Sequence, residues 1–179
     1  FDHRANRRLP CTWWMRRPEQ MDYLQEPDCF HDVFGHVPLL INPVFADYMQ
    51  AYGEGGLKAE RLQVLPMLAR LYWYTVEFGL IQTTEDLRIY GAGIVSSKAE
   101  SLYSLDSDAP HRVGFDLRRI LRTEYKIDDV QKTYFVIRDF AQLFDQTRAD
   151  FTLIYDELKA LPSFSADQIQ VGDQIVSRT

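Results

Sequence analysis

Residues 26–53 read EPDCFHDVFGHVPLLINPVFADYMQAYG and residues 68–81 read LARLYWYTVEFGLI; these two stretches decide the fold. In the first, the Asn-Pro pair at 42–43 supplies an N-cap and a first-turn proline, which predicts a helix that ends at Gly53. In the second, apolar residues fall on nearly every side of a helix that begins at Pro66 and ends between Gly79 and Gln82. We therefore expect this second helix to be buried at the centre of the protein.

The rest of the chain predicts shorter elements. They are a strand at 87–90, a glycine turn at 91–93, a helix from Ser97 with capping-box spacing, a helix at 115–125, a strand at 134–137 and a helix at 138–161. The predicted fold is mainly α with a few short β-strands, in one domain that covers residues 1–179. The polar stretch 162–179 is expected to be loosely held.

Composition and charge exclude several classes of partner. The 179 residues are 46% apolar and carry a net charge of −6, which describes one compact domain and argues against nucleic-acid binding. The two cysteines, Cys11 and Cys29, form no disulfide or metal motif, which suits a reducing cytoplasm. No signal peptide is visible, and the longest apolar stretch, 65–81, is interrupted by charged residues, so no membrane partner is expected.

His31 and His36 are candidate metal ligands. Residues five apart lie about 140° from each other around an ideal α-helix, so this pair lacks the one-face spacing of HExxH. Gly35 loosens the backbone, and Pro38 is expected to push Val37 out of the helical region, so that the helix ends near His36. A histidine in the helix and a histidine at its unravelled end can then converge. The alternative is one capping histidine and one core histidine that hydrogen-bonds to the backbone.

Glu77 favours the metal interpretation. It lies among large apolar side chains on the predicted buried helix, where an ionised carboxylate is costly unless it is paired or bound to a metal. Arg70, two turns earlier on the same face, is the alternative partner. Two imidazoles and a carboxylate make the facial triad of Fe(II) oxygenases, which leaves coordination positions open. Zinc hydrolases use the same ligand types, but the glutamate base that they need beside the first histidine is absent, and Asp32 would have to replace it.

Four blocks of the sequence, in the same order, resemble the family of pterin-dependent aromatic amino acid hydroxylases. Two are the stretches quoted above, and the others are RIYGAGIVSSKAES at 88–101 and QKTYFVIRDFAQLFD at 131–145. The match runs from about Arg8 to about residue 150 and is most similar to the bacterial phenylalanine 4-hydroxylases. The resemblance implies the catalytic-domain fold of this family, with Fe(II) as the metal and tetrahydropterin as a co-substrate.

The resemblance also implies a role for individual residues. His31, His36 and Glu77 correspond to the iron ligands at the catalytic centre, and Asp32 and Tyr72 lie on the pterin side of the iron. The substrate site would consist of Arg16 on the substrate carboxylate, Ser96 beside that carboxylate and an iron-ligand histidine, and a ring pocket of Pro27, Trp73, Phe78 and Gly93. Without the resemblance, these positions are explained by core packing, helix capping or surface charge.

The family further sets expectations for what surrounds the chain. Family catalytic domains extend upstream of Phe1 with a segment that stacks on the pterin, so this chain is expected to lack the N-terminal part of the domain. The regulatory domain and the tetramerising C-terminal helix of the animal enzymes have no counterpart here, so a monomer is expected. Two positions depart from the family pattern. Leu24 replaces a threonine of the animal phenylalanine hydroxylases, and Asp32 replaces a glutamate.

The expected activity is the hydroxylation of L-phenylalanine to L-tyrosine with Fe(II), O2 and tetrahydropterin, as part of phenylalanine catabolism. Ile127 occupies a position where tyrosine hydroxylases carry an aspartate, and an apolar residue there suits a ring without a hydroxyl group. Tryptophan or tyrosine hydroxylation is the alternative within the family. A zinc-dependent hydrolase, and a relative that binds aromatic amino acids without turnover, are the alternatives outside this activity.

Overall fold

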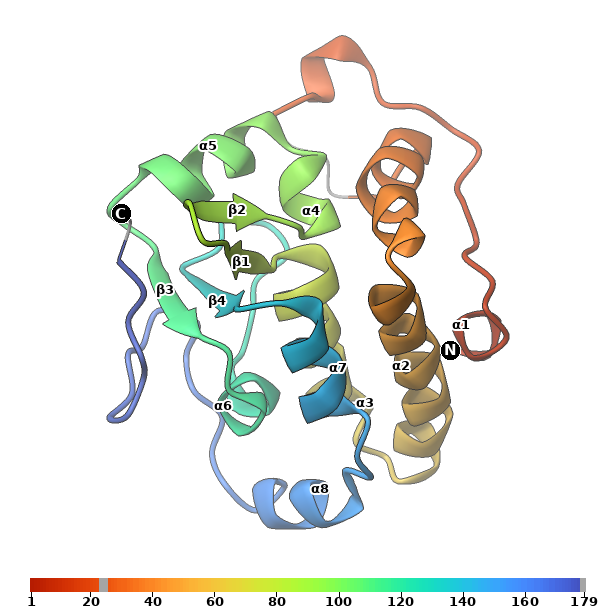
Figure 1. The fold of residues 1–179 in the computed structure, drawn as a ribbon, viewed down its shortest axis with the longest axis vertical. Helices are drawn as coiled ribbons and strands as arrows, with labels where there is room; N and C mark the ends of the chain where they lie inside the picture. The colour runs from red at the N-terminus through yellow and green to blue at the C-terminus, as the bar shows by residue number, and fades with distance from the viewer. Residues whose placement is uncertain (23–25, 178–179) are drawn as a thin grey trace.

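A small mixed sheet packed between helices forms the centre of the fold (Figure 1). The computed structural model describes residues 1–22 and 26–177, and Leu24 lies outside these residues. The strand order is β2-β1-β4-β3, with β1 antiparallel to β2 and parallel to β4, and β3 parallel to β4. The strands are β1 (Leu80–Gln82), β2 (Leu87–Ile89), β3 (His111–Gly114) and β4 (Thr133–Ile137).

Helices cover both faces of the sheet. The α-helices of the described residues are α1 (Asp2–Ala5), α2 (Pro43–Arg61), α3 (Leu65–Tyr72), α4 (Ala92–Val95), α5 (Lys98–Asp106), α6 (Leu117–Arg122), α7 (Phe140–Thr147) and α8 (Thr152–Leu158). The described residues also form two 3₁₀ helices, η1 (Pro18–Gln20) and η3 (Val37–Ile41), and two π-helices, η2 (His31–His36) and η4 (Trp73–Glu77). None of these helices combines the length and the apolarity that a membrane crossing needs.

Alternation along β4 divides the core into two clusters. All five residues of β4 are buried, and successive side chains point to opposite faces of the sheet. Phe135 and Ile137 join the larger cluster, which α2, α3, α6, α7 and α8 complete. Tyr134 and Val136 join the smaller cluster, which lies against α4 and α5. The mainly α fold with a few short strands is therefore confirmed, and β4 holds its two halves together.

The helix α2 is longer than the sequence predicted. Asn42 caps its first turn by accepting from the backbone N–H of Val44 at 3.0 Å, as expected, but the helix passes Gly53 and ends at Arg61. A Cβ atom at Gly53 would lie 2.3 Å from the backbone nitrogen of Ala5. The prediction of a helix end at Gly53 was wrong because this glycine serves the close approach of α1 to α2 and does not stop the helix.

Two other element predictions need correction. The helix expected at 138–161 is divided into α7, which ends at Thr147, and α8, which begins at Thr152, where the carboxylate of Asp150 accepts hydrogen bonds from the backbone N–H and the hydroxyl of Thr152. The expected glycine turn at 91–93 contains the first residues of α4, with Gly91 at its N-cap. The capping role of Ser97 is confirmed, since its hydroxyl accepts from the backbone N–H of Glu100 at 3.2 Å.

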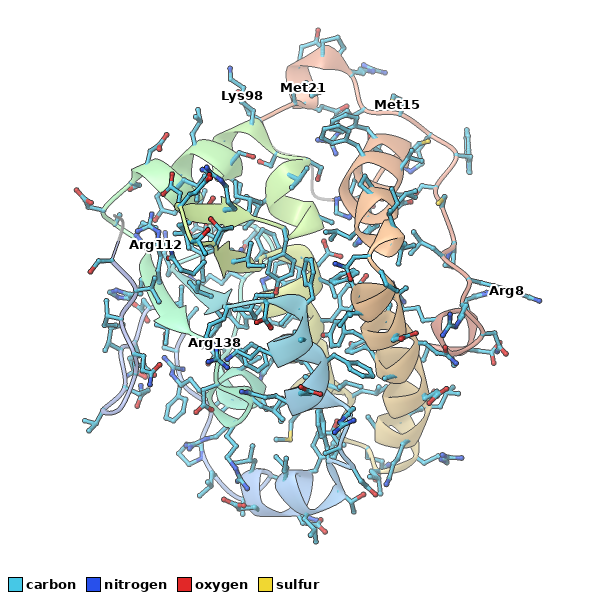
Figure 2. All side chains as sticks on the ribbon, in the orientation of Figure 1. Arg8, Met15, Met21, Lys98, Arg112 and Arg138 are labelled. Carbon is cyan, nitrogen blue, oxygen red and sulfur yellow. The ribbon has the colours of Figure 1, made fainter. Side chains whose placement is uncertain are left out.

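The C-terminal segment 162–177 runs along β3 and α6. The backbone N–H of Gly114 donates to the carbonyl of Gln174 at 2.7 Å, and Asp173 forms a buried ion pair with Arg119 at 3.0 Å. Figure 2 shows Arg112, whose carbonyl accepts from the N–H of Val176 at 2.8 Å, on the β3 side of the molecule. These contacts join residues 162–177 to the rest of the domain, and the expectation that the segment 162–179 is loosely held stays a prediction.

Candidate metal centre and substrate pocket

A π-helix brings His31 and His36 together. In this helix each N–H bonds to the carbonyl five residues earlier, so that residues five apart return to the same side. Their Nε2 atoms lie 3.1 Å apart, and the two rings stand at 83° to each other. The predicted unravelling at His36 was wrong: Val37 has helical angles, φ −60° and ψ −41°, and η3 follows η2 directly. A wider helix, and not its end, makes the histidines converge.

Gly35 allows η2 to touch α4. A Cβ atom at Gly35 would lie 2.9 Å from the Cβ and 3.0 Å from the carbonyl oxygen of Ala92, so only glycine fits this contact without a shift. The sequence had suggested that Gly35 loosens the backbone. The structure shows instead that this glycine allows close packing. The same contact places Ser96, which follows α4, with its Oγ 2.8 Å from Nδ1 of His31. The Ser96 hydroxyl thus fixes the orientation of the His31 ring.

Glu77 closes the site from the second π-helix. The backbone N–H of Phe78 donates to the carbonyl of Trp73 at 2.8 Å, the five-residue spacing of a π-turn, and Glu77 stands at the end of that turn. Its Oε2 lies 3.5 Å from Nε2 of His31, and its Oε1 lies 3.4 Å from Nε2 of His36. Arg70 donates to the carbonyl of Leu121 at 2.8 Å, so the alternative pairing with Glu77 is not formed.

The three side chains have the geometry of a metal site. His31, His36 and Glu77 each offer one ligand atom, and all of these atoms lie within 4.8 Å of one another. The two Nε2 atoms are 3.1 Å apart, and each lies within 3.5 Å of a carboxylate oxygen of Glu77, which is the spacing of ligand atoms around one ion with bonds of about 2.1 Å. Burial lowers the pKa of His31, and this effect outweighs the opposing effect of Glu77. The lowered pKa favours the neutral ring, which is the form that binds metals.

A cavity of about 320 Å³ opens beside this triangle. His31 and Glu77 are part of its wall. All six of the predicted substrate residues also line it: Arg16, Pro27, Trp73, Phe78, Gly93 and Ser96. The aromatic wall is a stack in which the Trp73 ring lies between Phe78, at 4.6 Å between centroids, and Tyr125, at 4.3 Å. Such a pocket, with apolar walls and a few convergent polar groups, is typical of small-molecule sites.

Asp28 holds Arg16 at one end of the cavity. Nε and Nη2 of Arg16 donate to the two carboxylate oxygens of Asp28, at 3.1 and 2.8 Å, and Nη1 donates to the carbonyl of Ser96. Guanidinium carries five N–H groups, so two remain without a recorded partner among the described residues. Burial raises the pKa of Asp28, but its hydrogen bonds from Arg16 and from the N–H of His31 outweigh this and lower the pKa overall. The ion pair fixes a cation in the wall.

The two residues predicted on the pterin side differ in their surroundings. Tyr72 lines the cavity, and its hydroxyl accepts from Nη2 of Arg4 at 3.0 Å. Asp32 is buried, does not line the cavity, and accepts hydrogen bonds from the backbone N–H, at 2.6 Å, and the hydroxyl of Thr12. Thr12 belongs to the N-terminal segment, which continues past Met15 on the outside of the molecule (Figure 2).

The chain matches a known protein family along most of its length. The family model of the biopterin-dependent aromatic amino acid hydroxylases matches residues 2–169 of the chain. The chain belongs to this family. The match covers nearly all of the described residues, so the family assignment includes the metal triangle, the aromatic cavity and the sheet.

Individual members of the family resemble the chain closely. Phenylalanine-4-hydroxylase of Ralstonia nicotianae is 70% identical over 99% of the chain, and that of Chromobacterium violaceum is 63% identical over 99%. A crystal structure of the Chromobacterium violaceum enzyme bound to cobalt superimposes with a TM-score of 0.95 over 98% of the chain. The chain spans 56% and 60% of the two sequences and 63% of the crystallised chain.

Sequence reasoning missed several residues of the cavity. Glu26, Asp129 and Gln131 line it, and Asp28 supports it, but none was singled out. For Asp28 a signal was present: an aspartate three residues before His31 has N-cap spacing, and its carboxylate does accept from the N–H of His31 at 2.9 Å. Gln131 gave no such signal, because its importance depends on contacts with residues far away in the sequence.

Proposed function

We propose that the full-length protein is a phenylalanine 4-monooxygenase, which converts L-phenylalanine and O2 to L-tyrosine with Fe(II) and tetrahydropterin. The observation that carries this proposal is the position of the His31, His36 and Glu77 triangle on the wall of a cavity with an aromatic stack and a fixed arginine. A facial set of two imidazoles and one carboxylate leaves half of an octahedral sphere open, which suits an oxygenase.

The side chains of the cavity have separate tasks in this proposal. His31, His36 and Glu77 would hold the iron, which together with the pterin supplies the activation of O2. The two N–H groups of Arg16 that have no recorded partner among the described residues would receive the substrate carboxylate as a bidentate pair. Ser96 joins Arg16 to His31, because its carbonyl accepts from Arg16 and its hydroxyl contacts His31, and so it would keep the substrate carboxylate and the metal in register.

The ring pocket supports an aromatic substrate without a hydroxyl group. Pro27, Trp73, Phe78 and Gly93 provide apolar surface, and Ile127 lines the same cavity. A phenol would place a polar group against this surface without a good partner, which disfavours tyrosine as a substrate. Competition between the three aromatic amino acids in one assay separates phenylalanine from tryptophan hydroxylation.

The structure gives less support to a zinc-dependent hydrolase. Such an enzyme needs a carboxylate base beside the first histidine, and Asp32 is the residue at that place. Asp32 accepts from Thr12 and lies outside the cavity, so it has no access to a substrate there. The hydrolase therefore lacks the base that it needs beside the first histidine.

The proposal includes a cytoplasmic monomer. Cys11 and Cys29 are both free thiols, as proteins of a reducing compartment have. The net charge of −6 repels copies of the molecule from one another. Sedimentation of the purified protein under reducing conditions tests this part: a single species with the mass of one chain is expected, and a dimer or tetramer contradicts it.

Turnover under defined conditions tests the activity. The full-length protein is purified without oxygen, loaded with Fe(II), and mixed with tetrahydropterin, L-phenylalanine and O2. We expect tyrosine to form only when all four are present, and Glu77→Gln, which keeps the shape of the side chain but removes a charged ligand, to abolish the product. Tyrosine formation without pterin, or none with the complete mixture, contradicts the proposal.

A further inference from the structure

The Trp73 ring in the cavity wall is held by one directional contact. Its faces pack against Phe78 and Tyr125, but stacked aromatic rings tolerate a range of offsets, so stacking alone leaves the indole able to slide and turn in its plane. The indole Nε1–H donates to Oε1 of Gln131 at 2.8 Å. This hydrogen bond is the one recorded for the Trp73 side chain among the described residues, and it fixes the orientation of the ring.

Gln131 forms hydrogen bonds through both ends of its side-chain amide and through its backbone N–H. Its Nε2 donates to the carbonyls of Lys126, at 3.0 Å, and Asp129, at 3.2 Å, so that with the bond from Trp73 both functional ends of the amide are engaged. Its backbone N–H donates to Oε1 of Glu100 at 3.1 Å. Gln131 is only 4% exposed. A buried amide with three of its four hydrogen bonds formed, including both donors, has a restricted orientation.

The network reaches the centre of the fold. Oε1 of Glu100 also accepts from the hydroxyl of Tyr134 at 2.5 Å, and Tyr134 lies fully buried on β4. Glu100 is on α5, and the carbonyls bound by Gln131 belong to the loop that carries Ile127. Gln131 therefore connects the indole to α5 and to that loop, which both contribute to the cavity wall, and through Glu100 to β4 behind them.

We propose that Gln131 is a positioning residue that sets the substrate preference of the cavity by fixing the Trp73 indole. The proposal rests on the proposed function, since it assigns the selectivity of the same pocket. With the amide in place, the slot for the substrate ring is preformed, and its width is fixed before the substrate binds. Without the amide, the indole turns within its stack, and the slot admits larger rings at the cost of affinity for phenylalanine.

A double-mutant cycle tests the connection between the two residues. The dissociation constants of L-phenylalanine and L-tryptophan are measured by calorimetry on the full-length protein loaded with Co(II), for Gln131→Met, Trp73→Phe and the double variant. Because an indole without this partner must be ordered again when the substrate ring binds, Gln131→Met should weaken phenylalanine binding about tenfold and tryptophan binding less. In the Trp73→Phe background, Gln131→Met should change either constant by less than about twofold. Additive effects overturn the proposal.

A second measurement needs no substrate, and so separates this inference from the proposed function. Hydrogen exchange of the Trp73 indole N–H is followed by NMR, with Trp73→Phe to assign its signal. Gln131→Met, and Gln131→Asn, whose shorter amide cannot reach the indole, should each accelerate exchange about tenfold. Gln142→Leu is a matched control, because the side chain of Gln142 accepts from the N–H of Arg138, its one recorded hydrogen bond among residues 1–22 and 26–177, and does not line the cavity; this variant should leave the exchange unchanged. Equal exchange in the wild type and both Gln131 variants overturns the proposal, whatever the wild type binds.

Discussion

Replacing Asp28 with asparagine removes the anion that holds Arg16. The carboxylate is fully buried and accepts four hydrogen bonds: from the backbone N–H, Nε and Nη2 of Arg16 and from the N–H of His31. Asparagine keeps one oxygen, but its amide nitrogen would face the two Arg16 donors that now bond to Oδ2. The variant then contains a buried arginine without a counter-charge, which destabilises proteins by about 3–5 kcal/mol.

Urea unfolding at pH 7 measures this cost, and Asp47→Asn is the matched control. Asp47 pairs with Arg7 at 2.8 Å, a similar distance, but both side chains are largely exposed, so the control should lose less than about 1 kcal/mol. The pH dependence gives an independent check. Because the pKa of Asp28 is lowered in the folded state, its stabilisation is present above the unfolded pKa of about 3.9 and is lost as pH falls below it.

The difference in unfolding free energy between the wild type and Asp28→Asn should therefore be largest above about pH 5 and shrink steadily toward pH 3. A loss below about 1 kcal/mol at pH 7 would show that the buried pair contributes no more than a surface pair. A loss that stays constant down to pH 3 would show that the asparagine acts through its shape and not through the missing charge. Either result refutes the reasoning on Arg16.

Three other substitutions test single contacts of the site. Ser96→Ala removes the hydroxyl beside Nδ1 of His31 and should weaken metal binding about 10- to 100-fold in a Co(II) titration, so unchanged affinity contradicts the orienting role. Gly91→Ala places a methyl group 2.4 Å from the carbonyl oxygen of Glu77 and should destabilise the protein by about 1–3 kcal/mol or more in urea unfolding. Arg16→Lys loses the planar fork and should weaken phenylalanine binding at least about tenfold by calorimetry, and an equal affinity would remove Arg16 from the carboxylate site.

Local sequence rules succeeded where a side chain acts on its own backbone. Asn42 and Ser97 each cap the helix that the sequence assigned to them, through hydrogen bonds to N–H groups two or three residues later. The helix after Pro66 was predicted as a buried one, and its continuation η4 does bury Tyr74 and Val76. These features depend only on neighbours in the chain, which is why spacing could reveal them.

The rules failed where a distant segment decides the local shape. Gly53 and Gly35 were interpreted as breaks or loose points, but each is required by a neighbour, Ala5 and Ala92 respectively, that approaches too closely for a Cβ atom. The π-helix η2 could not be predicted from the spacing of its histidines, because its wider turn is stabilised by packing against α4. The convergence of the ligands was right, and the reason given for it was wrong.

The resemblance to the family identified more residues of the cavity than sequence patterns alone did. Trp73, Phe78 and Gly93 would have been assigned to core packing, but all three line the cavity. The supporting residues Asp28 and Gln131 escaped because their partners, Arg16 and Trp73, are brought close only by the fold. A single sequence reveals residues with unusual chemistry more readily than the residues that hold them in place.

Metal stoichiometry tests the central claim most directly. The protein is purified without oxygen, incubated with Fe(II), freed of excess metal and analysed for iron, with His36→Ala and Glu77→Ala treated in parallel. One iron per wild-type chain, and a loss of most of it in both variants, is the predicted result. No iron in the wild type, or equal iron in the wild type and both variants, would contradict a site built from these side chains.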